Sequence, residues 1–317
     1  MNVSRLIPTA AVAGAAVLGL TALTACSTSD AADHKNGDKL DVVASFYPMQ
    51  FLAEQIGGKH VSVTTLTKPG VEPHDLELTP RQTGGLGDAD YILYLKGIQP
   101  AVDDAIKESG SKHVLDTSTL TTLEDHGTET GGDEHGHEHH GDEAGADPHI
   151  WLDPVKYAEV AKGVGKSLEK TDPAHAADYR KNTDALVTEL EGLDTAYRNG
   201  LKDVTTKTFI TTHSAFGYLA ERYGLTQEGI AGIDPEAEPS PARISEIHTI
   251  AKKNKATTVF FETLASDKTA KTLAKDTGLK TDVLDPLEGI TDRSKGDDYI
   301  EVMQSNLAAL QKALGAK

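Results

Sequence analysis

The stretch TDPAHAADYRKNTDALVTELEGLDTAYRNGL, residues 171–201, divides the chain into two halves and decides the fold. Asp172 suits the N-cap of a helix and Pro173 its first position, so we predict a helix from 173 to 201. At 1.5 Å per residue this helix would be ~40 Å long, longer than a typical crossover. We therefore expect a stiff linker between two lobes. Its apolar residues recur at helical spacing: Tyr179, Leu186, Leu190, Leu193, Tyr197 and Leu201.

Short β-rich runs alternate with helical patterns on both sides of this helix. Near-continuous apolar runs separated by helices are typical of parallel strands covered on both faces. The sequence predicts an α/β fold with two lobes of parallel-rich sheet, 40–170 and 202–317, joined by the linker helix 171–201. The runs are DVVASF (41–46), VSVTTLT (61–67), ADYILYL (89–95), KHVLDTS (112–118), KTFITT (207–212), LTQEGI (225–230), TTVFFET (257–263) and TDVLDP (281–286).

The N-terminus has the pattern of an export signal. Arg5 precedes a mostly apolar run from 6 to 22, and the small residues before Cys26 resemble the lipobox of bacterial lipoproteins. We expect residues 1–25 to be a signal peptide, Cys26 to be lipidated, and 26–39 to be a flexible tether outside the cytoplasm. An uncleaved anchor is the alternative, since the apolar run is nearly long enough to span a membrane. The position of the only cysteine favours lipidation.

Charge and cysteine usage restrict the ligand. The formal charge of −18 argues against nucleic acid and anionic membrane, which are bound through clustered Lys and Arg. A cationic ligand fits better. With Cys26 acylated, no thiol remains for a soft metal site or for thiolate catalysis. Any metal site must therefore use nitrogen and oxygen donors.

Three histidines each follow a predicted strand or begin a turn. They are His74 in KPGVEPHDLELTP, His149 in ADPHIWLDP and His213 in ITTHSAFGYLA. In open α/β sheets ligands bind beyond the carboxyl ends of the strands, so these three side chains are predicted to meet in one crevice. Neutral imidazoles suit Zn²⁺, which takes a tetrahedral shell and tolerates one carboxylate or water.

Three carboxylates are candidates for the same site. Asp285 ends the last predicted strand and would be the fourth ligand, with a simple Asp-Pro turn as the alternative. Glu72 competes for that role, although Pro73 makes ligation together with the nearby histidine harder. Glu262 ends the predicted strand before it and is a candidate to orient a metal-bound histidine. A plain structural role for Glu262 is the alternative.

Residues 124–147, EDHGTETGGDEHGHEHHGDEAGAD, lack periodicity and are predicted to form a mobile loop. Ordering such a segment costs about 1–2 kcal/mol per residue, so its histidines are predicted to capture zinc weakly and raise the local supply. Two alternatives are an inert acidic insertion and a transient fourth ligand from one of these histidines. The histidines concerned are His126, His135, His137, His139 and His140.

Several motifs together carry a resemblance to a known family. EPHDLELTP (72–80), DPHIWLDP (147–154), THSAFGYLA (212–220), GIDPEAEPSPARISEI (232–247) and the final DP (285–286) are similar to the metal-binding cluster A-I solute-binding lipoproteins of ABC transporters, of the zinc-uptake type. The similarity covers nearly the whole chain from residue 40.

The resemblance implies two Rossmann-like lobes, a rigid linking helix, and a metal between the lobes. The ligands would be His74, His149 and His213, with Asp285 completing the set. Manganese-selective members usually carry a carboxylate at the position of His213, so nitrogen there indicates zinc. The histidine-rich segment is likewise a mark of the zinc members.

The predicted function is an extracytoplasmic receptor, not an enzyme, that binds Zn²⁺ with high affinity and delivers it to an ABC permease. The chain is expected to be a monomer held at the membrane by its lipid. It has no phosphate-binding glycine loop, so the cytoplasmic ATPase must be a separate protein. The alternatives are a manganese or iron receptor of the same fold, a zinc hydrolase and an adhesin. The hydrolase is disfavoured because the sequence has no H-E-x-x-H pair.

Overall fold

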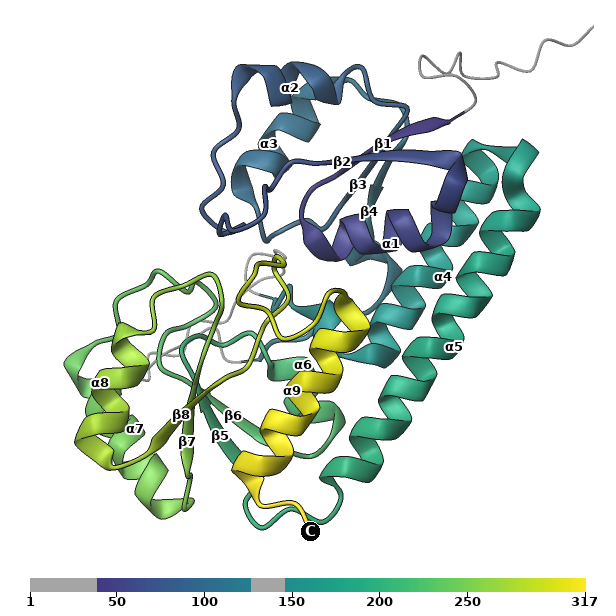
Figure 1. The fold of residues 1–317 in the computed structure, drawn as a ribbon. Helices are drawn as coiled ribbons and strands as arrows, with labels where there is room; N and C mark the ends of the chain where they lie inside the picture. Colours follow the sequence, from purple (N-terminus) through teal and green to yellow (C-terminus); the bar gives the residue numbers. More distant parts are fainter. Residues whose placement is uncertain (1–38, 127–145) are drawn as a thin grey trace, which may run out of the picture. The chain divides into compact units, whose positions relative to one another are not determined.

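The computed structural model describes residues 39–126 and 146–317 (Figure 1). The predicted signal peptide, the predicted lipidation site Cys26, and His135, His137, His139 and His140 lie outside these described residues. None of the helices in the described part is long and apolar enough to cross a membrane. Both lobes belong to one unit of the chain, 34–317.

The first lobe is a four-stranded parallel sheet in the order β2-β1-β3-β4. Helix α1 packs on one face together with α4 and α5, while α2 and α3 lie against the other face (Figure 1). The order reverses between β1 and β3, which opens a crevice at the carboxyl ends of these strands. The elements are β1 (Leu40–Ala44), α1 (Tyr47–Gly57), β2 (Val61–Thr65), α2 (Pro80–Leu86), β3 (Tyr91–Tyr94), α3 (Pro100–Ser109) and β4 (Val114–Asp116).

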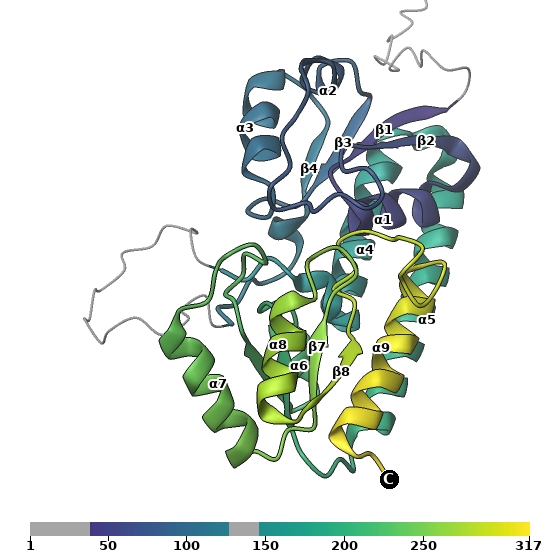
Figure 2. The same ribbon diagram turned by 60° about the vertical axis from the view of Figure 1, so that its left-hand side comes forward.

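The second lobe repeats this plan with the order β6-β5-β7-β8, again all parallel. Helices α7 and α8 cover one face and α9 lies against the other (Figures 1 and 2). The eight strands predicted from the sequence are all present, and the predicted fold class is confirmed. The elements are β5 (Thr208–Thr211), α6 (Gly217–Arg222), β6 (Thr226–Gly229), α7 (Pro241–Lys253), β7 (Thr258–Phe261), α8 (Lys268–Thr277), β8 (Lys280–Val283) and α9 (Tyr299–Leu314).

The linker helix is α5, Ala176–Leu201, and it packs along α4, Pro154–Thr171, in a helical hairpin. Gly165 of α4 lies so close to Thr183 of α5 that any Cβ there would collide with the threonine hydroxyl. The two helices therefore approach closely at this point. In Figure 1 and Figure 2, α5 extends beyond α4 and runs beside α9 of the second lobe.

Helix α5 begins three residues later than predicted. Pro173–His175 form a 3-10 turn, and the α-helix starts at Ala176. Asp172 makes no side-chain cap, because its carboxylate accepts hydrogen bonds from His175 Nδ1 at 2.7 Å and from Tyr179 Oη at 2.6 Å. The carboxylate thus fixes the turn between α4 and α5 instead of capping the helix.

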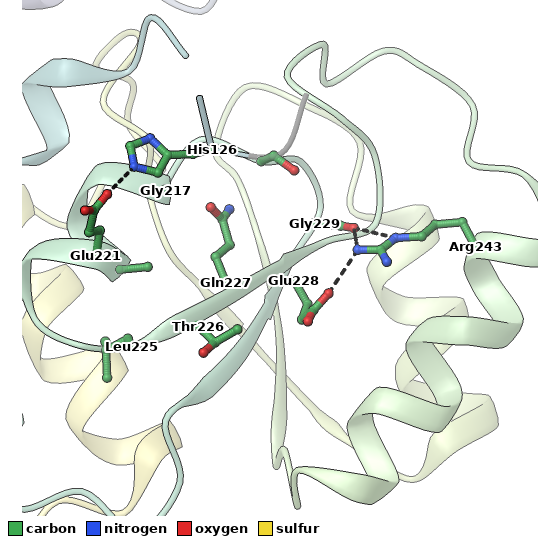
Figure 3. A pocket seen from close by; sticks show the side chains of 11 residues that line it. His126, Gly217, Glu221, Leu225, Thr226, Gln227, Glu228, Gly229 and Arg243 are labelled. Carbon is green, nitrogen blue, oxygen red and sulfur yellow. Dashed lines mark hydrogen bonds and ion pairs between the residues drawn. The ribbon is translucent and has the colours of Figure 1, made fainter. Parts of the chain in front are cut away.

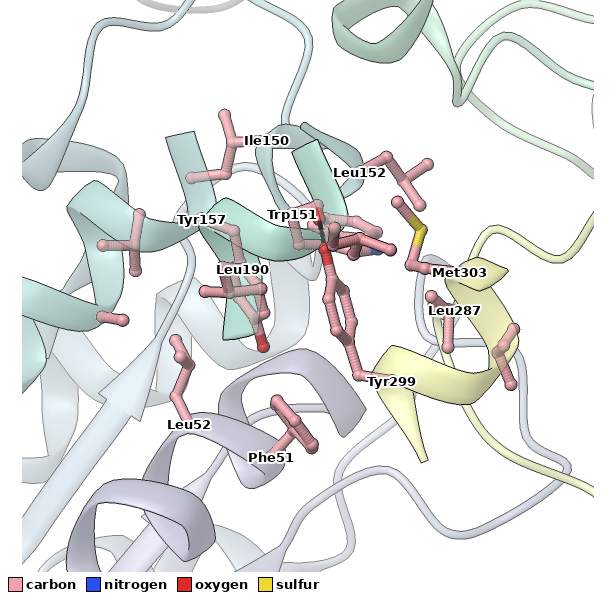
Figure 4. Close-up of a cluster of buried hydrophobic side chains, with 14 of the residues drawn as sticks. Phe51, Leu52, Ile150, Trp151, Leu152, Tyr157, Leu190, Leu287, Tyr299 and Met303 are labelled. Carbon is pink, nitrogen blue, oxygen red and sulfur yellow. Dashed lines mark hydrogen bonds between the residues drawn. The ribbon is translucent and has the colours of Figure 1, made fainter. Parts of the chain in front are cut away.

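Trp151 connects the two lobes through a shared core. Its indole Nε1 donates to the carbonyl oxygen of Pro286 at 2.7 Å, and Tyr299 Oη donates to the carbonyl oxygen of Trp151 at 2.6 Å. The ring is fully buried and contacts Phe46 edge-on, with ring centroids 5.1 Å apart. Figure 4 shows this cluster, in which side chains of α1, α4, α5 and α9 surround the indole. These two hydrogen bonds also hold position 149, two residues before Trp151, at the junction of the lobes.

Candidate metal centre

Four side chains meet between the carboxyl ends of the two sheets. His74 lies in the connection from β2 to α2, His149 precedes the turn that leads into α4, and His213 follows β5 by two residues. Glu288 follows the end of β8. The structure therefore brings together the three histidines that the sequence predicted, and it adds a glutamate.

The spacing of these donors matches a tetrahedral ion. Oε1 of Glu288 lies 3.4 Å from Nε2 of His74, 3.3 Å from Nε2 of His149 and 3.4 Å from Nε2 of His213. In a regular tetrahedron with zinc–ligand distances of about 2.0–2.1 Å, the ligand atoms are about 3.3–3.4 Å apart. One donor atom of each residue lies within 4.8 Å of all the others.

The donor atoms are buried and point at a shared centre. The side chains of His149, His213 and Glu288 are 0% exposed, and that of His74 is 9% exposed. Nε2 of His149 and Nε2 of His213 make no hydrogen bond with any described residue. Buried polar atoms are rarely left without a partner. This arrangement leaves both nitrogens free to bind a cation.

Two carboxylates fix the orientation of the imidazoles from behind. Asp147 Oδ1 accepts from Nδ1 of His149 at 2.7 Å and from its backbone N at 2.9 Å. Glu262 Oε1 lies 2.6 Å from Nδ1 of His213, which is the orienting contact considered for it from the sequence. A carboxylate on Nδ1–H places the free lone pair on Nε2, facing the centre. Sequence reasoning missed Asp147, although it stands two residues before a candidate ligand.

The structure does not bring Asp285 into the cluster, and Glu288 takes the place expected for it. Both oxygens of Asp285 are used inside its own loop: Oδ1 accepts from the backbone N of Leu287, and Oδ2 accepts from the hydroxyls of Thr263 and Ser294. These bonds shape a turn in which Leu287 adopts a left-handed φ of 59°. Asp285 therefore holds the loop that presents the glutamate three residues later.

Glu72 is close to the centre but is not one of the four donors. Its Oε1 accepts from the backbone N of His74 at 3.1 Å, and its buried Oε2 has no partner among the described residues. Burial, followed by repulsion from Glu288, raises the pKa of Glu72 to about 9. Burial also disfavours the charge on Glu288, but the three adjacent imidazoles outweigh burial and hold the pKa of Glu288 well below its usual value. Of the two glutamates, Glu288 therefore carries the charge.

The carboxylates also act on the histidines. Burial alone would lower the pKa of His149, but the hydrogen bond to Asp147 and the nearby carboxylate of Glu288 outweigh burial and raise it. The pKa of His213 is raised well above its usual value, because Glu262 and Glu288 outweigh burial in the same way. A metal ion entering this centre must therefore displace protons.

His126, a predicted weak-capture residue, lies outside the four-residue centre. Its Nδ1 is 3.2 Å from Oδ2 of Asp147, and its Nε2 is 2.7 Å from Oε2 of Glu221. Asp147 therefore contacts both His126 and His149.

Comparisons with known proteins identify a matching family and several similar proteins. Residues 42–313 match the family model of ZnuA, the periplasmic component A of the zinc-uptake complex. The chain is 41% identical over 295 residues to the high-affinity zinc uptake system protein ZnuA of Bacillus subtilis, with 92% of each chain covered. It is 38% identical over 296 residues to the zinc-binding lipoprotein AdcA of Streptococcus pneumoniae, with 92% of this chain but only 58% of that relative covered.

A solved relative agrees in fold. The Zn(II)-bound ZnuA-like domain of Streptococcus pneumoniae AdcA aligns with a TM-score of 0.73 at 34% identity, covering 87% of this chain and 99% of that one.

Proposed function

Because the chain belongs to the family of periplasmic zinc-uptake components, we propose that it is a high-affinity receptor for Zn²⁺ rather than an enzyme. It binds the ion outside the cytoplasm and delivers it to an ABC permease that a separate cytoplasmic ATPase drives. The receptor acts as a monomer held at the membrane by a lipid on Cys26. Zn²⁺ is the cargo of this protein.

The observation that supports this proposal is the spacing of the four donors. Each of the three imidazole Nε2 atoms lies 3.3–3.4 Å from Oε1 of Glu288. This set of three nitrogens and one oxygen suits a borderline cation in a tetrahedron. Manganese favours octahedral sites built mainly from oxygen donors, and iron(II) is typically held by two histidines and one carboxylate with open coordination positions. With neutral imidazoles and an ionised Glu288, the loaded centre carries +1, which the carboxylates of Asp147 and Glu262 offset from behind.

A cargo site fits the geometry better than a hydrolytic site does. Catalytic zinc keeps one coordination position open for water, and a base stands beside that water. Here four protein donors fill the tetrahedron, and three of them are completely buried. His74 is the most exposed donor, so the ion is expected to enter and leave on its side.

The test is a titration of Zn²⁺ against a competing chelator with H74A, H149A, H213A and E288Q. Structural zinc sites contribute about 10–16 kcal/mol through four ligands, or about 3 kcal/mol each. Each variant should therefore bind Zn²⁺ at least about a hundredfold more weakly.

The matched control is E191Q, which removes the same charge as E288Q from an exposed position on α5. Wild-type affinity in all three histidine variants would contradict the assignment. Competition with Mn²⁺ and Fe²⁺ should leave zinc bound, and the loaded protein should turn over no ester, peptide or phosphate substrate.

A further inference from the structure

The connection that carries His74 is fixed at its base by a buried, hydrogen-bonded threonine. Thr67 is the last buried residue before the exposed turn 68–71, which leads to His74. Its hydroxyl donates to the carbonyl oxygen of Ser45 at 2.9 Å and accepts from Nε2 of Gln99 at 2.9 Å. Thr67 is only 5% exposed and Gln99 only 1% exposed. Because solvent is excluded there, these bonds fix the point from which the turn departs.

Beyond His74 the connection is held by apolar contacts. Leu76 and Leu78 pack against the buried cluster that contains Leu86. Among the described residues, the polar contacts of 68–78 stay within that stretch, except that Nε2 of His74 lies 3.4 Å from Oε1 of Glu288. The hydrogen bonds that place the first half of the connection are therefore those at its base.

The second lobe repeats this arrangement behind His213. The hydroxyl of Thr211, at the end of β5, donates to the carbonyl oxygen of His213 at 2.6 Å and accepts from Nε2 of Gln227 at 2.7 Å. Nε2 of Gln227 also donates to the carbonyl oxygen of His213 at 3.0 Å. Gln227 stands on β6 and lines the cavity drawn in Figure 3. In each lobe a glutamine thus donates to a threonine, and the threonine donates to a carbonyl oxygen just beyond a strand.

We infer that these two threonine–glutamine pairs are positioning residues for zinc binding, which hold the backbone of a donor histidine in place before the ion arrives: Thr67 and Gln99 for His74, Thr211 and Gln227 for His213. This inference rests on the proposed receptor function. Groups that are already ordered in their bound arrangement lose less entropy when the ligand binds. Contacts behind the ligands are also known to change metal affinity.

The experiment replaces each threonine hydroxyl by a methyl group, in T67V and T211V, and measures zinc affinity by chelator competition. Each variant should bind Zn²⁺ about fivefold more weakly, the equivalent of one net hydrogen bond. T67S and T211S keep the hydroxyl and should restore the affinity. The control T117V removes another buried hydroxyl of the first lobe, which donates to the carbonyl oxygen of Tyr94 at 3.0 Å, and should bind zinc as the wild type does.

Double-mutant cycles separate positioning from general destabilisation. T67V should weaken the remaining zinc affinity of H213A about fivefold. It should leave that of H74A unchanged, because the backbone at 74 no longer presents a donor. T211V should show the opposite pattern. A loss of fold stability would instead weaken binding equally in both backgrounds.

Hydrogen exchange on the zinc-free protein gives a readout that involves no metal. The amides of Val71, His74 and Leu76 are bonded within the connection. T67V should speed the exchange of these amides and leave those of β5 unchanged, because only the connection is released. Q99L should have the same effect, and adding Q99L to T67V should weaken zinc binding no further.

The outcomes distinguish this inference from the proposed function. Wild-type zinc affinity in T67V, T211V, Q99L and Q227L would overturn the positioning role, and so would an equal loss for T67V in the H74A and H213A backgrounds. Weak zinc binding by the wild-type chain would instead refute the proposed receptor function.

Discussion

Replacing Glu262 by Gln tests how far the zinc affinity depends on the carboxylate behind His213. The pair is buried: the side chain of His213 is 0% exposed and that of Glu262 is 2% exposed. The distance from Nδ1 to Oε1 is 2.6 Å, slightly shorter than the ~2.7–2.9 Å typical of a charge-assisted N–H···O hydrogen bond. An imidazole that binds Zn²⁺ becomes more positive, so this bond strengthens when the metal arrives.

The magnitude follows from the change in bond type. A hydrogen bond to a charged group contributes about 1.5–3 kcal/mol, and a neutral one about 0.5–1.5 kcal/mol. Gln keeps an oxygen acceptor but loses the charge, so E262Q should lose about 1–1.5 kcal/mol of zinc binding, or about 5- to 12-fold in Kd. E262A also leaves Nδ1–H without its acceptor, and its loss should reach about 10- to 100-fold.

The assay is a chelator competition at fixed pH for wild type, E262Q, E262A and the exposed charge control E191Q. We expect the order wild type and E191Q, then E262Q, then E262A. The carboxylate has no role in affinity if E262Q and E262A bind zinc as tightly as wild type. An equal loss in E191Q would show that net charge alone is responsible.

Three further predictions concern protons and the helical hairpin. Burial lowers the pKa values of His149 and His213, but neighbouring carboxylates outweigh it and raise them. Because zinc binds neutral imidazole, we expect zinc affinity to weaken as the pH decreases, beginning above about pH 6.5. A Kd that is constant from about pH 8 to about 5.5 would contradict this. Gly165→Ala places a methyl group against Thr183 and should cost about 1–3 kcal/mol in urea unfolding. Gly192→Ala, at an exposed position of α5 with nothing within 4 Å, should instead stabilise the fold by about 0.5–1 kcal/mol, and a loss equal to that of Gly165→Ala would show that close packing is not the cause.

The strands and the linker helix could be predicted from the sequence because their signals are local. Apolar runs such as ADYILYL keep their meaning without tertiary context, and β3 appears within that run at Tyr91–Tyr94. The start of α5 was less predictable. Asp172 is of a residue type that often caps a helix, but its carboxylate accepts hydrogen bonds from Tyr179 and His175 instead. Which of these partners it takes depends on how α4 and α5 pack together.

The histidines of the centre were predictable because strand ends converge at one edge of a parallel sheet. The fourth donor was not. Asp285 and Glu288 stand in the same short motif, and only the bonds from Leu287, Thr263 and Ser294 decide which carboxylate turns inward.

The four donors of the centre belong to four different connections, and none of them neighbours another along the chain. An unfolded polypeptide therefore does not present these four donors together, and capture at this centre requires the folded chain. The bound cation joins the two lobes and raises the free energy of unfolding of the protein by RT ln(1 + [L]/Kd). A series of melting temperatures measured at graded Zn²⁺ concentrations therefore reports the Kd of the cargo without a label.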